Sequence, residues 1–233
     1  MIIMSSRILI ILSFILGCNF SQAWDKELAI GFLQTTGNSP SKSNNLRFLI
    51  KKNHEEYLYN LDISTFNQSK KKDNVAEKYK ILAKIDKEIS NQKTFYILFL
   101  TEDDRFSGFD YQSSINFGYG RTLVEDNTKK LRVEFGPGYR VSAIPEQPKE
   151  REITFRIGEE YTLDLSKNAD LKQSLSISSG EDNMIINFEL GLSTSITDSL
   201  SLSLVYDSKY TDRVPIGRRN NDSKTSIQFN YSF

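Results

Sequence analysis

The feature that most constrains this chain is a period of two in hydropathy, which runs through almost every segment after residue 23. In Leu200–Tyr206, for example, leucine or tyrosine fills every second position and serine fills most of the others. Successive side chains of a β-strand point to opposite faces, so this pattern is typical of strands with one apolar and one polar face. No segment carries a convincing helical stripe. The sequence therefore predicts an all-β protein.

Twelve segments carry this alternation and are bounded by turn-forming residues. They are Lys26–Thr36, Asn45–Lys52, Tyr57–Gln68, Val75–Ile89, Lys93–Thr101, Tyr111–Val124, Lys129–Ala143, Arg151–Leu165, Asp170–Ser178, Asn183–Ile196, Leu200–Tyr210 and Asp222–Phe233.

The connections between these segments alternate in length. Five are hairpin-length turns: 53–56, 90–92, 125–128, 166–169 and 197–199. The others are mostly longer: 37–44, 69–74, 102–110, 144–150 and 211–221. Short turns at one end and long loops at the other are typical of outer-membrane barrels, in which the short turns face the periplasm.

The apolar face could meet either a protein core or lipid. A mean hydropathy of −0.44 would suit a soluble sandwich or a lipocalin-like barrel. Three features favour lipid: aromatic residues often end the apolar face, several strands exceed ten residues, and the polar face is rich in glycine and in charges of both signs. Because lipid cannot pair an open sheet edge, such a sheet must close. We therefore expect a closed antiparallel up-and-down transmembrane β-barrel of about 12 strands.

Two positions depart from this pattern. Glu159 falls in the lipid-facing register, where a charge is costly, so we expect a bulge there or a position near the periplasmic rim. Pro137 cannot donate to a strand ladder, so Gly136–Gly138 is expected to mark a bulge or kink.

The first 23 residues have the layout of a secretory signal peptide. Arg7 precedes the apolar run Ile8–Gly17, and small residues at 21 and 23 frame a cleavage site after Ala23. The predicted domains are thus a signal peptide, 1–23, and a barrel, 24–233. A lipobox-like string ending at Cys18, which is the only cysteine, leaves a lipid-anchored form as the alternative.

The last strand alternates strictly and ends on an aromatic residue. Phe229, Tyr231 and Phe233 occupy one face. This resembles the terminal signal that the barrel-assembly machinery of Gram-negative bacteria recognises, so we expect that machinery, with outer-membrane lipid and lipopolysaccharide, as partners.

Several internal motifs are similar to a known family. They are Phe106–Tyr111, Gly118–Gly120, Glu134–Arg140 and Gly158–Tyr161, with Thr36–Asn38 as a first turn. These motifs resemble the YdiY-like salt-induced outer-membrane proteins, a family defined by a domain of unknown function. The resemblance covers most of the chain after residue 23 and implies an outer-membrane location but no established activity.

The polar face supplies the candidate functional residues. Nine are expected to line the lumen: Lys78, Lys80, Lys84, Asp86, Arg132, Glu134, Arg140, Arg156 and Glu160. With Asp62, Lys172, Glu189, Asp207 and Lys209 they hold eight bases and six acids, a slight cationic bias that would favour anions. In an eight-stranded barrel, side chains alone fill the interior, and a barrel of twelve strands is wider. The sequence is therefore compatible both with an open pore and with an interior filled by side chains.

Other features offer little chemistry. His54, the only histidine, falls in a predicted inner turn, away from where a serine hydrolase would need it. The acidic loop 102–110, which includes Asp103 and Asp104, could hold calcium or serve catalysis, or simply be solvated. Lys70–Lys72 and Arg218–Arg219 could meet lipopolysaccharide phosphates. Thirty basic and thirty acidic residues give no reason to expect nucleic acid, and no cofactor is expected.

These observations predict a non-enzymatic outer-membrane barrel, with a narrow porin-like channel for small polar or anionic solutes as the first hypothesis. A non-transporting structural or adhesive barrel is the second, and an outer-membrane hydrolase is the third.

Overall fold

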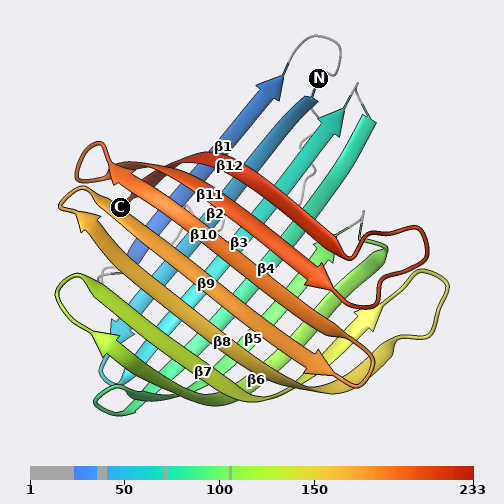
Figure 1. Cartoon of the computed structure of the whole chain (residues 1–233), viewed down its shortest axis with the longest axis horizontal. Helices are drawn as coiled ribbons and strands as arrows, with labels where there is room; N and C mark the ends of the chain where they lie inside the picture. Colours follow the sequence, from blue (N-terminus) through green and yellow to red (C-terminus); the bar gives the residue numbers. More distant parts are fainter. Residues whose placement is uncertain (1–23, 36–40, 71–72, 105–106) are drawn as a thin grey trace.

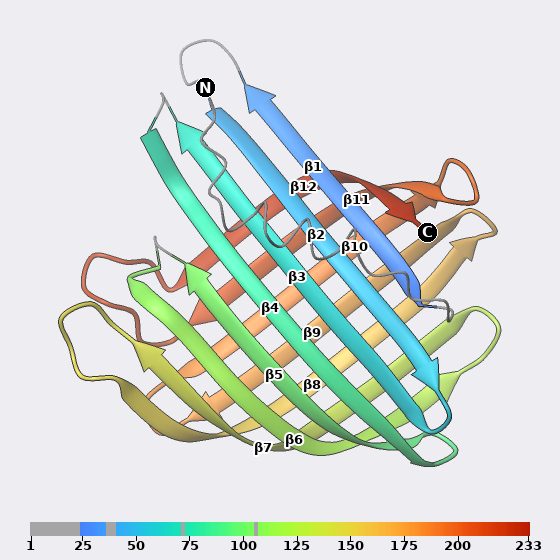
Figure 2. The same cartoon turned by 180° about the vertical axis from the view of Figure 1, so that it is seen from behind.

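The computed structural model is one closed antiparallel barrel of twelve strands, each paired with its neighbours along the chain and the last paired with the first (Figures 1 and 2). It describes residues 24–35, 41–70, 73–104 and 107–233, so the predicted signal peptide and Cys18 lie outside the described residues. The predicted fold class is confirmed. Within the described ranges, no helix is both long and apolar enough to cross a membrane.

The bounds of the strands are β1 Asp25–Thr35, β2 Ser41–His54, β3 Tyr57–Lys70, β4 Asp73–Ser90, β5 Lys93–Asp104, β6 Phe109–Glu125, β7 Lys129–Ala143, β8 Glu150–Ser166, β9 Ala169–Gly180, β10 Met184–Ser195, β11 Leu200–Thr211 and β12 Asn221–Ser232. Eight of these strands are longer than the sequence pattern predicted, whereas β1, β7 and β12 have the predicted length and β10 is shorter.

Most of the extra length comes from the predicted long loops, which corrects that part of the prediction. Residues 69–70 and 73–74 belong to β3 and β4, and residues 102–104 belong to β5. These stretches are polar on both faces, so their sequence shows no alternation and predicts loops. Their backbone nevertheless continues the strand ladder. The connections that stay long at this end are 144–149 and 212–220.

The barrel has two distinct ends. The inner end carries the C-terminus, the start of β1 and the hairpin turns between β2 and β3, β4 and β5, and so on around the barrel. The outer end carries the connections after the odd-numbered strands. Strands β1 to β4 project beyond the others at the outer end (Figure 1).

Pairing between the first and last strands closes the sheet. Five residues of β1 pair with β12, from Glu27 with Ser232 to Gly31 with Gln228. The backbone N–H of Phe233 also donates to the carbonyl of Lys26 at 3.0 Å. The two edges are thus joined over Glu27–Gly31 and Gln228–Ser232, as a lipid environment demands, but the pairing does not extend to Phe32–Thr35 of β1 or Asn221–Ile227 of β12.

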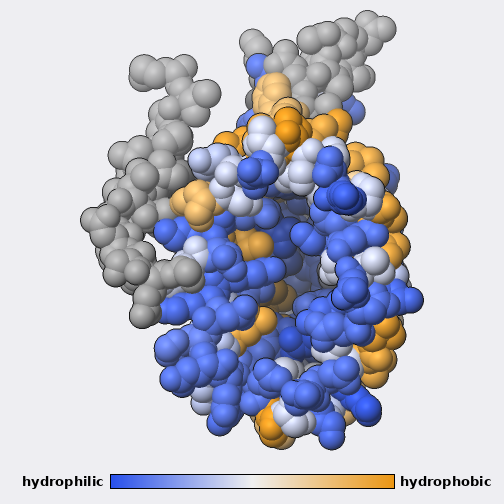
Figure 3. Space-filling view, turned by 90° about the vertical axis from the view of Figure 1, so that its left-hand side faces the viewer, coloured by the Kyte–Doolittle hydropathy of each residue, from blue (hydrophilic) through white to orange (hydrophobic). Residues whose placement is uncertain are grey.

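The two faces of the sheet meet different surroundings. Large apolar side chains project outward and stay exposed, with Ile153 at 78% and Phe95 at 57%. Charged side chains on the opposite face are enclosed: Glu134 is 2% exposed and Asp86 is 3% exposed. A protein in water would invert this distribution, whereas a barrel in a bilayer requires it. The inner end, seen in Figure 3, is hollowed and rimmed by hydrophilic side chains, and apolar ones cover the right-hand outside.

Pro137 does not cause the predicted bulge. Asn116 pairs with Gly138 and Tyr119 pairs with Phe135, so the register of β6 against β7 is the same on both sides of the proline. The two rungs between these pairs are missing, because proline lacks an N–H. The register shift between β6 and β7 lies further on, between Thr122 and Val124.

Close approach of β6 and β7 explains the glycines beside Pro137. A Cβ on Gly136 would lie 2.2 Å from the carbonyl oxygen of Phe117, and one on Gly118 would lie 2.1 Å from that of Phe135. Side chains cannot occupy those positions unless the two backbones separate. The absence of side chains at these two glycines therefore lets the backbones of β6 and β7 lie close together where the two ladder pairs are missing.

We expect Gly136→Ala to lower the free energy of unfolding by about 1–3 kcal/mol, the usual cost of overpacking. Gly191→Ala is the matched control, because the nearest atom to its added Cβ is 3.9 Å away. Urea titration of the folded fraction in detergent measures both variants. Equal stability of the two would show that β6 and β7 separate without strain.

Glu159 is also not accommodated by a bulge. It pairs with Val133 of β7 and Leu175 of β9 in unbroken register, and the shift between β8 and β9 comes later, between Asp164 and Ser166. Its side chain lies on the outer face, where Gln173 Nε2 donates to its Oε2 at 3.0 Å.

Candidate functional site

The nine predicted lumen residues all lie on the inward face of the sheet. Along β4, β7 and β8 they alternate with apolar residues that are exposed on the outer face. All nine stand on one wall, formed by β4 to β8, and six of them pair with one another: Lys84, Asp86, Arg132, Glu134, Arg156 and Glu160.

Glu134 is the centre of this charged wall. Its carboxylate forms ion pairs with Lys84 of β4, with Arg132 at 3.1 Å and with Arg156 of β8 at 3.1 Å. Arg132 also pairs with Asp86. A carboxylate this deeply buried is stable only with such partners, and here one acid holds three cations in place.

Two glycines on this wall leave room for side chains of β5 and β8 to meet, although these two strands are not neighbours. Tyr96 of β5 pairs with Gly118, and Arg156 of β8 pairs with Gly136, so two glycines separate Tyr96 from Arg156. The guanidinium carbon of Arg156 lies 5.8 Å from the centre of the Tyr96 ring, and Lys84 Nζ lies 5.5 Å from it. The ring thus spans the glycines and contacts both cations over its π face.

The opposite wall is built mainly of small hydroxyl and amide side chains. Ser193 and Ser203 share a hydrogen bond of 2.8 Å, and Asn230 donates to Ser203 at 2.5 Å. Inward positions of β9 to β12 continue this character, with Ser174, Ser176, Ser178, Asn187, Ser226 and Gln228. A wall of paired charges therefore faces a wall in which hydroxyl and amide side chains predominate, although it also carries Glu189, Asp207, Lys209 and Lys224.

Two further ion pairs connect strands that are not neighbours. Arg47 of β2 reaches Glu189 of β10 at 3.2 Å and also holds Asp62 at 2.6 Å. Lys209 of β11 reaches Glu102 of β5 at 2.5 Å. Since β11 and β5 are six strands apart in a ring of twelve, the second pair crosses the lumen.

The second of these pairs forms a constriction near the outer end. Lys78 also contacts Glu102 at 2.9 Å, and Lys209 donates to Gln112 at 2.9 Å. The Glu102 side chain is 9% exposed and the Lys209 side chain 15%, whereas Glu160, nearer the inner end, is 58% exposed. The lumen is thus open toward the inner end and narrow near the outer end. We call Lys78, Glu102, Gln112 and Lys209 the outer constriction.

A small cavity of about 50 Å³ adjoins this constriction, enough for a few water molecules. Residues of β5, β6, β7, β9, β10 and β11 line it, among them Glu102, Gln112, Arg140 and Lys209. The cavity as it stands holds only water-sized molecules, so a larger solute enters it only if side chains move.

Arg140 closes the wall beside the cavity. It forms an ion pair with Glu152 at 2.6 Å and donates to the backbone carbonyl of Asn183 at 2.5 Å. The other oxygen of Glu152 accepts from the backbone N–H of Asp182 at 2.9 Å. The Arg140–Glu152 pair therefore ties the β9–β10 connection to the barrel.

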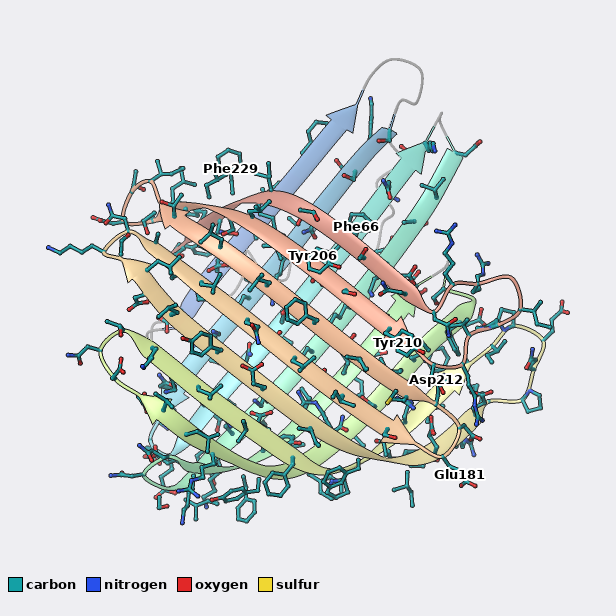
Figure 4. The ribbon with its side chains drawn as sticks, in the orientation of Figure 1. Phe66, Glu181, Tyr206, Tyr210, Asp212 and Phe229 are labelled. Carbon is teal, nitrogen blue, oxygen red and sulfur yellow. The ribbon has the colours of Figure 1, made fainter. Side chains whose placement is uncertain are left out.

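The connection 212–220 reaches over the outer constriction. Asn183 fixes its base through hydrogen bonds with the backbone N–H and carbonyl of Arg213, at 3.0 and 2.7 Å. Further along, Pro215 and Arg218 lie against Gly108, which connects β5 to β6 on the opposite side of the barrel. Glu181 and Asp212 mark this end in Figure 4. The loop thus spans the outer mouth.

Sequence reasoning missed further inward charges. Among them are the bases Arg47 and Lys224 and the acids Glu102, Asp104, Glu152, Asp170 and Asp222. Adding these two bases and five acids to the predicted eight bases and six acids removes the excess of bases, so the expected cationic bias of the lumen is not found. Arg47 could have been found, because it sits between the apolar positions Leu46 and Phe48.

The other predicted candidates are scattered. His54 ends β2 at the inner end, whereas Asp103 and Asp104 belong to β5 at the outer end, so the structure does not bring them together. Glu102 is a strand residue paired with lysines and not a loop ligand. Among the described residues, no group of three or more His, Cys, Asp or Glu could hold a metal ion.

The remaining predicted residues lie at the ends or on the outside of the barrel. Arg218 and Arg219 belong to the loop over the mouth, while Lys71 and Lys72 lie outside the described residues. Phe229 and Tyr231 project outward from β12, and Tyr231 stacks on Phe233 at 5.7 Å between ring centres. The terminal signal remains a prediction.

Solved structures with the same architecture are membrane barrels. The NanC porin matches with a TM-score of 0.54 and 12% identity over 91% of this chain and 99% of that one. The COG4313 outer membrane channel from Pseudomonas putida F1 matches with a TM-score of 0.53 and 7% identity over 90% and 94%. At these identities the likeness shows the fold alone.

Sequence comparison gives a family. The chain is 26% identical over 130 residues to the uncharacterized protein YdiY of Escherichia coli K12, a match that covers 55% of this chain and about half, 51%, of that protein. The model of a protein family of unknown function, DUF481, matches residues 28–233, which is nearly the whole barrel. The chain therefore belongs to the DUF481 family, as the YdiY-like motifs predicted.

Proposed function

We propose that this protein is an outer-membrane barrel whose lumen is a narrow passage for small polar solutes. The observation that carries the proposal is the enclosed polar face: it includes paired charges on one wall and hydroxyl and amide groups on the other, and it opens at the inner end (Figure 3). Such a lining replaces the hydration of a polar solute, whereas an apolar core would exclude it.

The outer constriction sets the size limit in this proposal. The ion pair between Lys209 and Glu102 joins its opposite walls at 2.5 Å, so a solute must displace this pair or pass beside it. Because inward acids and bases balance, we expect weak selectivity for charge and not the preference for anions that a cationic lumen would give. The proposed solutes are accordingly small, polar and carry little net charge.

Export and assembly complete the proposal. A signal peptide ending at Ala23 would deliver the chain across the inner membrane, and the strand ending in Phe233 would direct it to the assembly machinery. In that orientation the loop 212–220, with Arg218 and Arg219, faces the medium, where phosphate groups of lipopolysaccharide are available partners.

A non-transporting structural barrel is the second candidate, and the same constriction favours it. Were the pairs at Glu102 and Lys209 permanent, the lumen would stay closed beneath the loop 212–220. The barrel would then contribute mechanical stability or an adhesive outer surface.

Planar-bilayer recording on the refolded chain 24–233 distinguishes the two candidates. A channel of this kind gives small, discrete conductance steps, with similar permeability for potassium and chloride because the lumen charges balance. Absence of steps at all voltages and salt concentrations, for protein shown to be folded and inserted, would exclude transport.

A further inference from the structure

The outer face of β8 and β9 carries a polar pair that the lumen does not use. Glu159 and Gln173 lie side by side there, joined by one hydrogen bond of 3.0 Å from Gln173 Nε2 to Glu159 Oε2. Both side chains are half-buried, and the register neighbours of Glu159 on β7 and β9 are Val133 and Leu175.

This pair lies within the apolar belt and not at its edge. Toward the outer end of β8, Ile157, Phe155 and Ile153 follow on the same face, exposed by 51%, 50% and 78%. Toward the inner end come Tyr161, suited to the interface, and then Leu163. Glu159 is thus one outward position closer to the bilayer centre than the tyrosine. Hydrocarbon offers no hydrogen bond to a group placed there.

The pair leaves hydrogen-bonding capacity unused. A carboxylate has two oxygens and an amide has two N–H groups, and within the described part of the chain the single bond uses one of each. One acceptor, Glu159 Oε1, and one donor, the second N–H of Gln173, remain next to each other. In a second copy related by a two-fold axis, the free donor would face this acceptor and the free acceptor would face this donor.

We infer that this face is the contact of a two-fold dimer, in which Gln173 donates its second N–H to the partner's Glu159 and receives the reciprocal bond. The arrangement is isologous, as closed two-fold dimers are. Val133, Ile157 and Leu175 surround the polar pair and pack against the same residues of the second copy. The inference does not depend on the proposed channel, since each barrel keeps its own lumen.

Another polar pair on the outer face gives a matched control. Thr101 of β5 and Ser113 of β6 share a hydrogen bond of 2.7 Å. These are small neutral hydroxyls, whose remaining hydrogen can turn to a backbone carbonyl of the same strand. They do not require a second copy.

The mass of the refolded chain 24–233 in detergent micelles, measured by light scattering over a range of protein-to-detergent ratios, tests the inference. Wild type and Thr101→Val/Ser113→Ala are expected to be dimers. Glu159→Leu/Gln173→Leu should be a monomer, or a dimer whose dissociation constant is raised at least roughly tenfold, about 1.4 kcal/mol. Retarded migration of unheated samples on gels shows that each variant is folded.

Three outcomes of the mass measurement would overturn the inference: a monomeric wild type at every ratio, an equally stable dimer of the double-leucine variant, or loss of the dimer in the hydroxyl variant alone. Cross-linking through Ile157→Cys adds a positional readout, because the two-fold contact places this residue near its copy. A dimer that resists this cross-link would place the interface elsewhere and also contradict the proposal. Conductance of the double-leucine variant should match that of wild type per barrel.

Discussion

Replacing Glu134 by glutamine is expected to destabilise the barrel by about 3–5 kcal/mol, the cost of removing one partner from a buried ionic network. The substitution keeps the shape of the side chain but leaves Lys84, Arg132 and Arg156 with one fewer counter-charge. Because Glu134 is almost fully enclosed, water cannot compensate. Urea unfolding followed by tryptophan fluorescence and by gel migration measures the change.

Two further variants separate this effect from a general loss of charge. Glu160→Gln should cost about 1 kcal/mol or less, because that side chain is more than half exposed and reaches Lys84 only at 3.7 Å. The double variant Lys84→Met/Glu134→Gln should be more stable than Glu134→Gln alone. The two residues share one ion pair, so the second mutation removes a lysine that the first leaves without this partner. A Glu134→Gln variant within 1 kcal/mol of wild type would show that the wall is hydrated and that the pairs contribute little.

Breaking the outer constriction is expected to raise conductance severalfold. Lys209→Ala removes the side chain that crosses the lumen and releases Glu102 from one of its two lysines. The passage then widens and keeps an unbalanced acid, so the current should also become cation-selective. Glu102→Ala should widen it as well but shift selectivity toward anions, because Lys78 and Lys209 lose their shared acid. Single-channel recording with a salt gradient reports both quantities.

Lys172→Ala is the control for the loss of one lumen lysine. That side chain is 66% exposed and pairs locally with Asp170 at 3.5 Å, so its removal should change conductance little. If Lys209→Ala and Lys172→Ala behave alike, the constriction does not limit passage. Unchanged selectivity in both constriction variants would point to a permeation path that avoids Glu102.

The strand pattern could be predicted from the sequence because a barrel in lipid repeats one local rule. Every strand must present apolar residues to hydrocarbon, so the alternation in Lys129–Ala143 or Leu200–Tyr210 determines both the strand and its faces. The same rule predicts which charges point inward. It fails near the outer end, where strands leave the bilayer and polar residues occupy both faces, as in residues 102–104 of β5.

Contacts across the lumen could not be predicted in this way. That Lys209 meets Glu102, or Arg47 meets Glu189, depends on the curvature and stagger of the closed sheet, which no local pattern encodes. The glycines of β6 and β7 illustrate the same limit. Gly118 and Gly136 were recognised as motif residues, but their role in letting Tyr96 reach Arg156 appears only when four strands are placed side by side.

The orientation of the two faces is tested most directly by labels placed at outward and inward positions of several strands. Residues 24–233 contain no cysteine, so single cysteines can be introduced and labelled with an environment-sensitive dye in lipid vesicles. Labels at Ile97, Ile157 and Leu204 should be quenched by brominated lipid, and labels at Ser176, Ser203 and Gln228 by aqueous iodide. Quenching in the reverse sense, or solubility of the refolded protein as a single species without detergent, would show that the apolar face is an interior and that the protein does not span a membrane.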